Sequence, residues 1–283
     1  MRQSGSPHQP ITVGIFDSGV GGLSVLRAVR RALPTARLLY VADSGFAPYG
    51  ERTDEYVIDR ARRITSFLRD QRAEVIVIAC NTATAAASRA LRSEHPDIRF
   101  VGVEPGLKPA VARSRNKVVG VLATAGTLRS EKFLALLRPF ERQARIHLQA
   151  CPGLAQAIEG GDLGSGEIAE LVERYCAPLR AMETDTVVLG CTHYPFAIES
   201  IQQALGSNVQ LIDTAEAVAR QTAAQVEGLL ALTGTHRADA DFELGSDVTG
   251  FGAVVARTTG KVDALQRVCS AWLDFKVLVE VMQ

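Results

Sequence analysis

Short runs rich in β-branched residues alternate along this chain with longer segments that have the apolar spacing of helices. This alternation predicts βαβ units, in which parallel strands form a sheet and helices cover both faces. The expected strands are Thr12–Phe16, Arg37–Ala42, Val75–Ala79, Arg99–Val103, Val118–Leu122, Ile146–Gln149, Thr186–Leu189 and Val209–Ile212. The expected helices are Leu23–Leu33, Thr53–Asp70, Thr82–Ser93, Arg129–Arg138, Gly166–Met182, Tyr194–Leu205 and Ala215–Leu232.

The strands fall into two sets with similar sequences, which indicates an internal duplication. VGIFDSG (Val13–Gly19) resembles VGVLATAG (Val119–Gly126). VIVIACNT, which contains Cys80, resembles TVVLGCTH, which contains Cys191. We therefore expect an α/β protein with two similar doubly wound domains, whose parallel sheets are related by a pseudo-twofold duplication. The active site is expected in the cleft between them.

The repeat also predicts the domain boundaries. The first domain is expected to span residues 11–106, and residues 212–283 are expected to return to it mainly as helices. The second domain is expected to span residues 107–211. Residues 1–10 are polar and lack the apolar centre of a signal peptide, so they are expected to form a short disordered tail.

Composition excludes several classes of partner. Basic and acidic residues number 31 each, and the formal net charge of zero gives no support for a nucleic-acid or membrane-surface partner. No apolar run reaches the about 18–20 residues that a membrane helix needs. The five cysteines are widely spaced and no export signal precedes them, so we expect reduced thiols in a cytoplasmic protein.

Two of these cysteines stand where a parallel sheet binds ligands, at the carboxyl ends of strands. Cys80 is followed by Asn81 and Thr82, and Cys191 by Thr192 and His193, all of which can form hydrogen bonds to a small molecule. If the two halves face each other, the thiols flank one cleft from opposite sides. The remaining cysteines, Cys151, Cys176 and Cys269, are expected to be buried core residues.

Two thiols on opposite faces of one carbon suit the inversion of a stereocentre. One thiol removes a proton, and the other returns a proton to the far side. Because a free thiol has a pKa of about 8.5, neighbouring acid–base groups must hold one as a thiolate and the other as a thiol. The candidates are Asp17 in FDSGVGG and His193 in CTHYP, with Glu159 in CPGLAQAIEGG as a weaker third.

Other interpretations of these motifs remain open. The glycines of DSGVGG precede a helix, where backbone N–H groups favour anions and close ligand approach. A dinucleotide fingerprint would need glycine where Ser24 stands, although Asp43 falls near the position of a ribose-binding acid. The turn APYGER is either punctuation or a loop whose Tyr49 closes over a carboxylate. A metal site is not expected, because no C-x-x-C motif is present.

The motifs DSGVGG, APYGER, ACNTA, VEPG and LGCTHYP occur in this order, and together they resemble glutamate racemases of the aspartate/glutamate racemase superfamily. The resemblance covers nearly the whole chain. It implies interconversion of L- and D-glutamate without pyridoxal phosphate, metal or other cofactor, with D-glutamate used in peptidoglycan synthesis. It also implies that glutamate is the small-molecule partner and that the protein is a homodimer.

Carried over by motif, the resemblance implies that Cys80 acts on the D-enantiomer with help from Asp17. Cys191 would act on the L-enantiomer with help from His193 and Glu159. The implied substrate contacts are Asp17, Ser18, Tyr49, Gly50, Asn81, Thr82, Thr192 and His193, with Thr124 and Thr127 as further candidates. Ser44 and Gly106 depart from the family's usual Thr and Ala, and we expect these departures to affect packing or specificity only.

Two alternatives stay open at this point. The chain could be an aspartate racemase, or another enzyme of the superfamily that moves a proton next to a carboxylate. It could also be a two-lobed module that closes on an amino acid without chemistry. Such a module would not need paired thiols.

Overall fold

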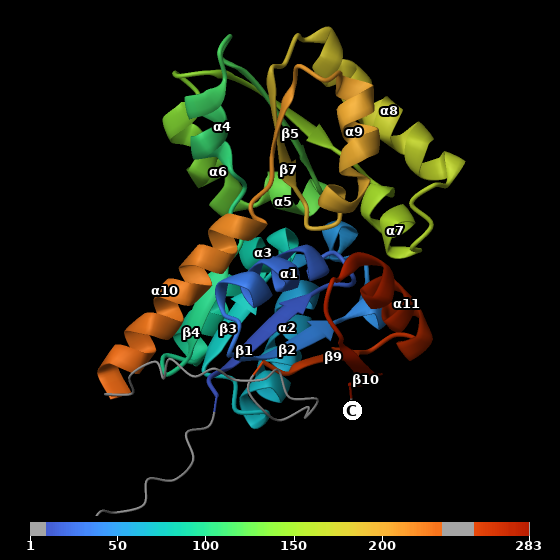
Figure 1. Cartoon of the computed structure of the whole chain (residues 1–283). Helices are drawn as coiled ribbons and strands as arrows, with labels where there is room; N and C mark the ends of the chain where they lie inside the picture. Colours follow the sequence, from blue (N-terminus) through green and yellow to red (C-terminus); the bar gives the residue numbers. More distant parts are fainter. Residues whose placement is uncertain (1–9, 234–251, 283) are drawn as a thin grey trace, which may run out of the picture.

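The computed structural model describes residues 10–233 and 252–282. In that part of the chain, two separate parallel sheets, each covered by helices, form two lobes (Figure 1). The expected α/β fold with two similar domains is confirmed. The predicted tail over residues 1–10 lies outside the described residues except for Pro10.

The first sheet has the strand order β10-β9-β2-β1-β3-β4, and every pairing in it is parallel. Its strands are β1 (Thr12–Asp17), β2 (Arg37–Ala42), β3 (Val75–Ile78), β4 (Arg99–Gly102), β9 (Val254–Thr258) and β10 (Leu278–Val281). Strand β1 is buried along its whole length, as expected for a central strand with helices on both faces. Its last residue, Asp17, pairs with Ala42 at the end of β2, so the carboxyl ends of these strands lie at one edge.

The second sheet repeats this arrangement. Its strands are β5 (Val118–Ala123), β6 (Arg145–Ala150), β7 (Thr186–Gly190) and β8 (Gln210–Ile212), in the parallel order β6-β5-β7-β8. Strands β2-β1-β3-β4 follow one another in the same relative order in the first sheet. The shared order agrees with the internal duplication expected from the sequence.

Helices pack on both faces of each sheet. On the first sheet, one face is covered by α1 (Leu23–Ala32), α10 (Ala215–Thr233) and α11 (Val262–Trp272), and the other by α2 (Asp54–Asp70) and α3 (Asn81–Glu94). On the second sheet, the helices are α7 (Leu154–Glu159), α8 (Gly166–Ala181) and α9 (Ile198–Leu205) on one face, with α4 (Leu107–Arg113) and α6 (Glu131–Leu137) on the other. Short connecting helices are α5 (Ala125–Arg129), η1 (Ser44–Phe46), η2 (Tyr49–Glu51), η3 (Arg138–Phe140) and η4 (Tyr194–Ala197).

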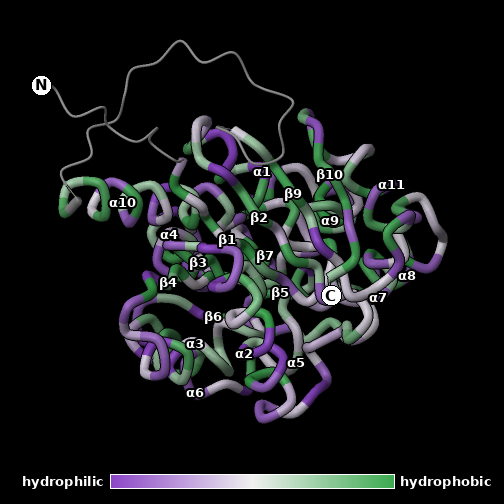
Figure 2. The backbone as a smooth tube through the Cα atoms, turned by 90° about the horizontal axis from the view of Figure 1, so that it is seen from below, coloured by the Kyte–Doolittle hydropathy of each residue, from purple (hydrophilic) through white to green (hydrophobic). Residues whose placement is uncertain are grey.

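Helix α10 shows how the C-terminal part returns to the first lobe. Hydrophilic and hydrophobic residues alternate along it (Figure 2), and Val218, Ala219 and Val226 are buried against the first sheet's core. This is the pattern of a helix with one buried face. Among residues 10–233 and 252–282, no helix is both long enough and apolar enough to span a membrane.

The expectation of a helical return omitted two strands. Strands β9 and β10 extend the first sheet beyond β2. Both are short, and each carries a charge, which weakens the apolar pattern by which strands are identified. Those charges pair in the structure, because Arg257 lies opposite Glu280 in the ladder and its Nη2 is 2.5 Å from the Glu280 carboxylate.

Two predicted helices differ from the structure, and three helices observed within residues 10–211, α4, α5 and α7, were not predicted. The segment expected as one helix over Arg129–Arg138 is divided at Ser130, whose Oγ accepts a hydrogen bond from the Phe133 N–H and so caps α6. The segment expected to begin at Tyr194 starts as the short helix η4, with Pro195 in its first turn.

Candidate active site

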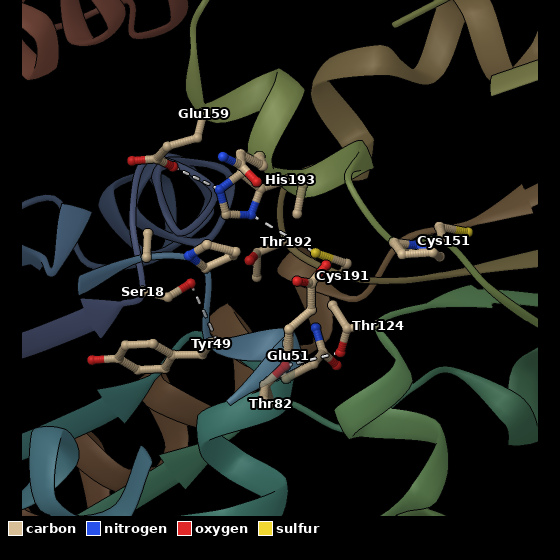
Figure 3. A pocket seen from close by; sticks show the side chains of 18 of the residues that line it. Ser18, Tyr49, Glu51, Thr82, Thr124, Cys151, Glu159, Cys191, Thr192 and His193 are labelled. Carbon is tan, nitrogen blue, oxygen red and sulfur yellow. Dashed lines mark hydrogen bonds and ion pairs between the residues drawn. The ribbon is translucent and has the colours of Figure 1, made fainter. Parts of the chain in front are cut away.

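The carboxyl ends of the two sheets face a common cavity of about 230 Å³. Cys80 follows β3 in the first lobe, Cys191 follows β7 in the second, and both line this cavity. Figure 3 shows the cavity with Cys191 among its labelled residues. The first lobe contributes Ser18, Ser44, Ala47, Pro48, Tyr49, Gly50, Glu51, Cys80, Asn81 and Thr82 to its wall. The second contributes Thr124, Ala125, Cys151, Pro152, Gly153, Ala155, Gln156, Glu159, Cys191, Thr192 and His193. The structure therefore gathers every predicted site residue except Asp17 and Thr127 around one space.

On the second lobe, three side chains form a chain that ends at Cys191. Its Sγ lies 3.7 Å from Nδ1 of His193, and Nε2 of the same ring lies 2.8 Å from Oε2 of Glu159. Figure 3 shows the imidazole between the thiol and the carboxylate. This is the arrangement of a thiol with an acid–base partner and an orienting carboxylate.

Electrostatics favours the ionised forms of His193 and Glu159. Burial alone would lower the pKa of His193, but its hydrogen bonds to Cys191 and Glu159 outweigh burial and raise that pKa well above its usual value. Burial opposes ionisation of Glu159 as well, yet His193, Ser44 and the Val20 N–H bond its carboxylate and lower its pKa. These contacts favour the protonated ring beside the Cys191 sulfur.

On the first lobe, Cys80 has different surroundings. It is the N-cap residue of α3, where its Sγ accepts a hydrogen bond from the Ala83 N–H at 3.5 Å and donates one to Ser18 Oγ at 3.8 Å. Burial, reinforced by the nearby Asp17 carboxylate, raises the pKa of Cys80 to about 12. These surroundings favour the neutral thiol form of Cys80.

Asp17 lies behind the cavity wall rather than in it. Its side chain is fully buried, and its carboxylate accepts hydrogen bonds from the Gly19 N–H and from the Thr192 hydroxyl of the opposite lobe, each at 2.9 Å. Burial raises the pKa of Asp17, although His193 opposes the shift. The structure therefore places Asp17 close enough to influence Cys80 but not in the cavity wall, which differs from the substrate contact implied for it.

The glycines of DSGVGG leave room for side chains of the second lobe to lie against the first lobe's backbone. A Cβ atom on Gly19 would lie 2.1 Å from Glu159 Oε2, and one on Gly21 would lie 2.4 Å from His193 Nδ1. The anion expected at the start of this helix is Glu159, whose Oε2 accepts a 2.8 Å hydrogen bond from the Val20 N–H. These residues thus let the second lobe's acid–base groups approach the first lobe's backbone.

The APYGER loop also differs from expectation. The hydroxyl of Tyr49 donates a hydrogen bond to Asp43, and its ring points away from the cavity in Figure 3. Asp43 is itself fully buried and forms an ion pair with Arg60, with Nη2–Oδ1 and Nε–Oδ2 distances of 2.8 and 2.9 Å. The hydroxyl of Tyr49 cannot close over a carboxylate in this state, and Asp43 cannot serve as a ribose-binding acid.

Polar groups in the remaining wall are suited to a small polar ligand. The hydroxyls of Thr82 and Thr124 come from opposite lobes and lie 3.0 Å apart, and Thr127 lies 3.4 Å from Thr82 and 3.0 Å from Thr124. Among the described residues, the buried Oδ1 of Asn81 has no hydrogen-bond partner. Because a buried unpaired oxygen is unfavourable, it is a natural acceptor for a ligand's ammonium group.

Some lining residues were missed or assigned elsewhere by the sequence reasoning, notably Ser44, Glu51, Cys151 and Gln156. Cys151 follows the end of β6 directly, so the strand-end rule that identified Cys80 also applied to it. Its Sγ donates a hydrogen bond to the Gln149 carbonyl at 3.5 Å, and burial raises its pKa. All five cysteines are free and buried. In the described part of the chain, no group of three or more His, Cys, Asp or Glu side chains could hold a metal ion.

Comparison with known proteins identifies the family. The sequence profile of the Asp/Glu/hydantoin racemase family matches residues 21–222. The glutamate racemase of Ectopseudomonas mendocina is 52% identical over 221 residues, which cover 78% of this chain and 82% of that protein. The glutamate racemase of Pseudomonas putida is 48% identical over 257 residues, covering 90% and 97%.

Solved structures agree with the sequence relatives. A glutamate racemase isoform from Bacillus anthracis superposes with a TM-score of 0.79 at 30% identity, covering 98% of each chain. The Escherichia coli glutamate racemase, solved with L-glutamate and the activator UDP-MurNAc-ala, superposes with a TM-score of 0.80 at 32% identity, covering 95% of this chain and 97% of that one. With the profile match and these relatives together, this chain belongs to the Asp/Glu/hydantoin racemase family.

Proposed function

We propose that this protein is a glutamate racemase that interconverts L- and D-glutamate without pyridoxal phosphate, metal or other cofactor. One observation carries the proposal: Cys80 and Cys191 line a single cavity from opposite lobes, with His193 in contact with Cys191 and the Asp17 carboxylate near Cys80. The relatives of highest identity reported above are named glutamate racemases, which supports glutamate as the substrate.

The reaction begins at Cys191 when L-glutamate is bound. The His193 imidazolium, 3.7 Å from Sγ, stabilises a thiolate, and this thiolate removes the α-proton of L-glutamate. Cys80, held as a thiol, donates its proton to the opposite face of the α-carbon and becomes a thiolate. The product is D-glutamate, and the reverse reaction starts from Cys80 with Asp17 as its partner.

The α-proton of an amino acid is only weakly acidic, so the site must stabilise a carbanion-like state. The start of α3, with the N–H groups of Asn81 and Thr82, offers hydrogen bonds and the positive end of a helix dipole to the substrate's α-carboxylate. The hydroxyls of Thr82 and Thr124 add further donors. Ser18, Gly50 and Thr192, which also line the cavity, complete the proposed substrate contacts with His193 and the backbone of Tyr49.

The same family membership supports the wider setting that we propose. The protein acts in the cytoplasm on free glutamate, with no nucleic-acid or membrane partner, and it supplies D-glutamate for peptidoglycan synthesis. It assembles as a homodimer. Five free cysteines are consistent with a reducing compartment.

Chiral chromatography tests the reaction and its substrate. The full chain is incubated with L-glutamate and, separately, with L-aspartate, in the presence of a chelator and without added cofactor. The proposal predicts D-glutamate, approaching equal amounts of the two enantiomers, and unchanged L-aspartate. Formation of D-aspartate alone would instead establish an aspartate racemase. No product from either amino acid, with a folded protein, would favour the binding module.

A further inference from the structure

The Glu159 carboxylate is held mainly by groups of the opposite lobe. Its Oε2 accepts hydrogen bonds from the Val20 N–H and from His193 Nε2, both at 2.8 Å. Its Oε1 accepts one from the Ser44 hydroxyl at 2.6 Å. Val20 and Ser44 belong to the first lobe, whereas Glu159 and His193 belong to the second. Both carboxylate oxygens are therefore fixed, and two of the three donors lie across the cleft.

These contacts extend the acid–base chain by one link. Ser44 does not touch a thiol, but it bonds the carboxylate that orients His193, and His193 contacts Cys191. Without the Ser44 hydroxyl, Oε1 loses the one side-chain donor that the described residues give it, and the carboxylate is held through Oε2 alone. The sequence predicts an effect on packing or specificity for the serine at this position, and it does not anticipate this contact with Glu159.

We propose that Ser44 is a positioning residue for proton transfer at Cys191, a role that rests on the proposed racemisation. The hydroxyl of Ser44 and the Val20 N–H fix Glu159 so that it keeps His193 protonated beside Cys191. Because both donors come from the first lobe, Cys191 and its partners His193 and Glu159 reach their reactive arrangement only when the two lobes are in contact.

Ser44 also lies in a loop with anchors of its own, which makes a matched control possible. The Gly45 N–H donates a hydrogen bond to Thr259 Oγ1 at 3.1 Å, and that hydroxyl donates to Asp43 Oδ1 at 2.9 Å. Replacing Thr259 by Val disturbs this loop without removing any group that contacts Glu159. Replacing Ser44 by Ala removes the contact with Glu159, and Ser44→Thr retains a hydroxyl.

The pH dependence of kcat/KM for glutamate is the discriminating measurement. The two enantiomers have equal free energies, so kcat/KM must change equally in both directions and cannot itself identify the affected thiol. Ser44→Ala should weaken the hold of Glu159 on His193 and lower the pKa of the ring. We expect the alkaline limb of the profile to move down by about half a pH unit or more. We also expect a roughly tenfold loss of kcat/KM, the lower end for a hydrogen bond to a charged group.

The other variants separate positioning from loop structure. Ser44→Thr keeps a hydroxyl, so its pH profile should have the alkaline limb at the wild-type position. Thr259→Val should also have the alkaline limb at the wild-type position, whatever its effect on stability. An unmoved limb in folded Ser44→Ala, or an equal displacement in Thr259→Val, would overturn the proposal. If Ser44→Ala does not fold, Gly19→Ala serves instead, because its added Cβ would displace the Glu159 carboxylate. It should move the alkaline limb of the pH profile in the same way.

A second readout does not depend on turnover. The His193 ring can be titrated by NMR in the wild type and in Ser44→Ala with isotope-labelled histidine. A lower His193 pKa in the variant supports the positioning role, and an unchanged one refutes it. If the wild type does not racemise glutamate, this titration still decides the role of Ser44, and only the proposed function fails.

Discussion

The buried ion pair between Arg60 and Asp43 should be a main source of stability at the carboxyl-end edge of the first sheet, which faces the cavity. Arg60 comes from α2, and its guanidinium binds both oxygens of Asp43, which lies directly after β2. The Asp43 side chain is fully inaccessible, and that of Arg60 is 9% exposed. The same carboxylate accepts hydrogen bonds from the hydroxyls of Tyr49 and Thr259. We predict a large destabilisation on replacing Arg60 by Met.

Removal of one partner from a buried pair leaves an uncompensated charge and costs roughly 3–5 kcal/mol. Tyr49 and Thr259 still donate to Asp43, so we expect the lower end, about 3 kcal/mol. For a chain of this size such a loss corresponds to a Tm lower by roughly 6–12 °C. The Tyr49–Gly50 loop, which Asp43 anchors, should also lose its position at the cavity, so activity should fall at temperatures where the variant remains folded.

Urea unfolding of the full chain measures this difference, with Arg62→Met as the control. Arg62 lies on the same helix and pairs with Glu94 at 2.6 Å, but its side chain is 50% exposed. A solvent-exposed pair adds little to stability, so the control should leave the unfolding midpoint nearly unchanged. Equal midpoint shifts for the two variants would refute the reasoning, because the buried pair would then contribute no more to stability than the exposed one.

Three further predictions follow from the site. Cys80→Ser and Cys191→Ser should each lower kcat by about 100-fold or more, since an alcohol cannot replace a thiol in proton transfer, while Cys176→Ala should retain turnover. Gly21→Ala should lower kcat/KM by about tenfold or more, because its Cβ would lie 2.4 Å from His193 Nδ1 and displace the ring. The raised pKa of His193 adds stability that is complete below the unfolded value of about 6.5 and is lost as pH rises through the folded pKa. Urea midpoints of His193→Gln should lack this alkaline decline, and a decline of equal size would contradict the assignment.

The two thiols could be found from sequence because each follows a strand that can be recognised locally. Cys80 and Cys191 end apolar β-branched runs, and the repeat places them at equivalent positions of two sheets. Parallel strands bring their carboxyl ends to one edge, so local pattern and topology lead to the same conclusion. The polar residues that follow each cysteine share its position for the same reason.

The contacts between lobes could not be predicted, because they depend on how the two sheets face each other. Nothing local indicates that Glu159 meets Val20 and Ser44, or that Gly19 and Gly21 are needed for that approach. Strand β9 was missed for a related reason: it is short and carries Arg257, which is paired only once Glu280 of β10 lies beside it. The hydroxyl of Tyr49 likewise binds a partner, Asp43, that the turn motif does not reveal.

Isotope incorporation during racemisation in D2O tests the two-thiol mechanism most directly. The wild-type protein, whose thiols exchange with solvent, is given L-glutamate, and the α-hydrogen of substrate and product is followed by NMR and mass spectrometry at early times. Protonation from the opposite face by a second thiol predicts deuterium at the α-carbon of nearly every D-glutamate formed, while the remaining L-glutamate keeps its proton. D-glutamate that retains the original proton, or an L-glutamate pool that becomes deuterated as fast as product forms, would show that a single group serves both faces and would contradict the account.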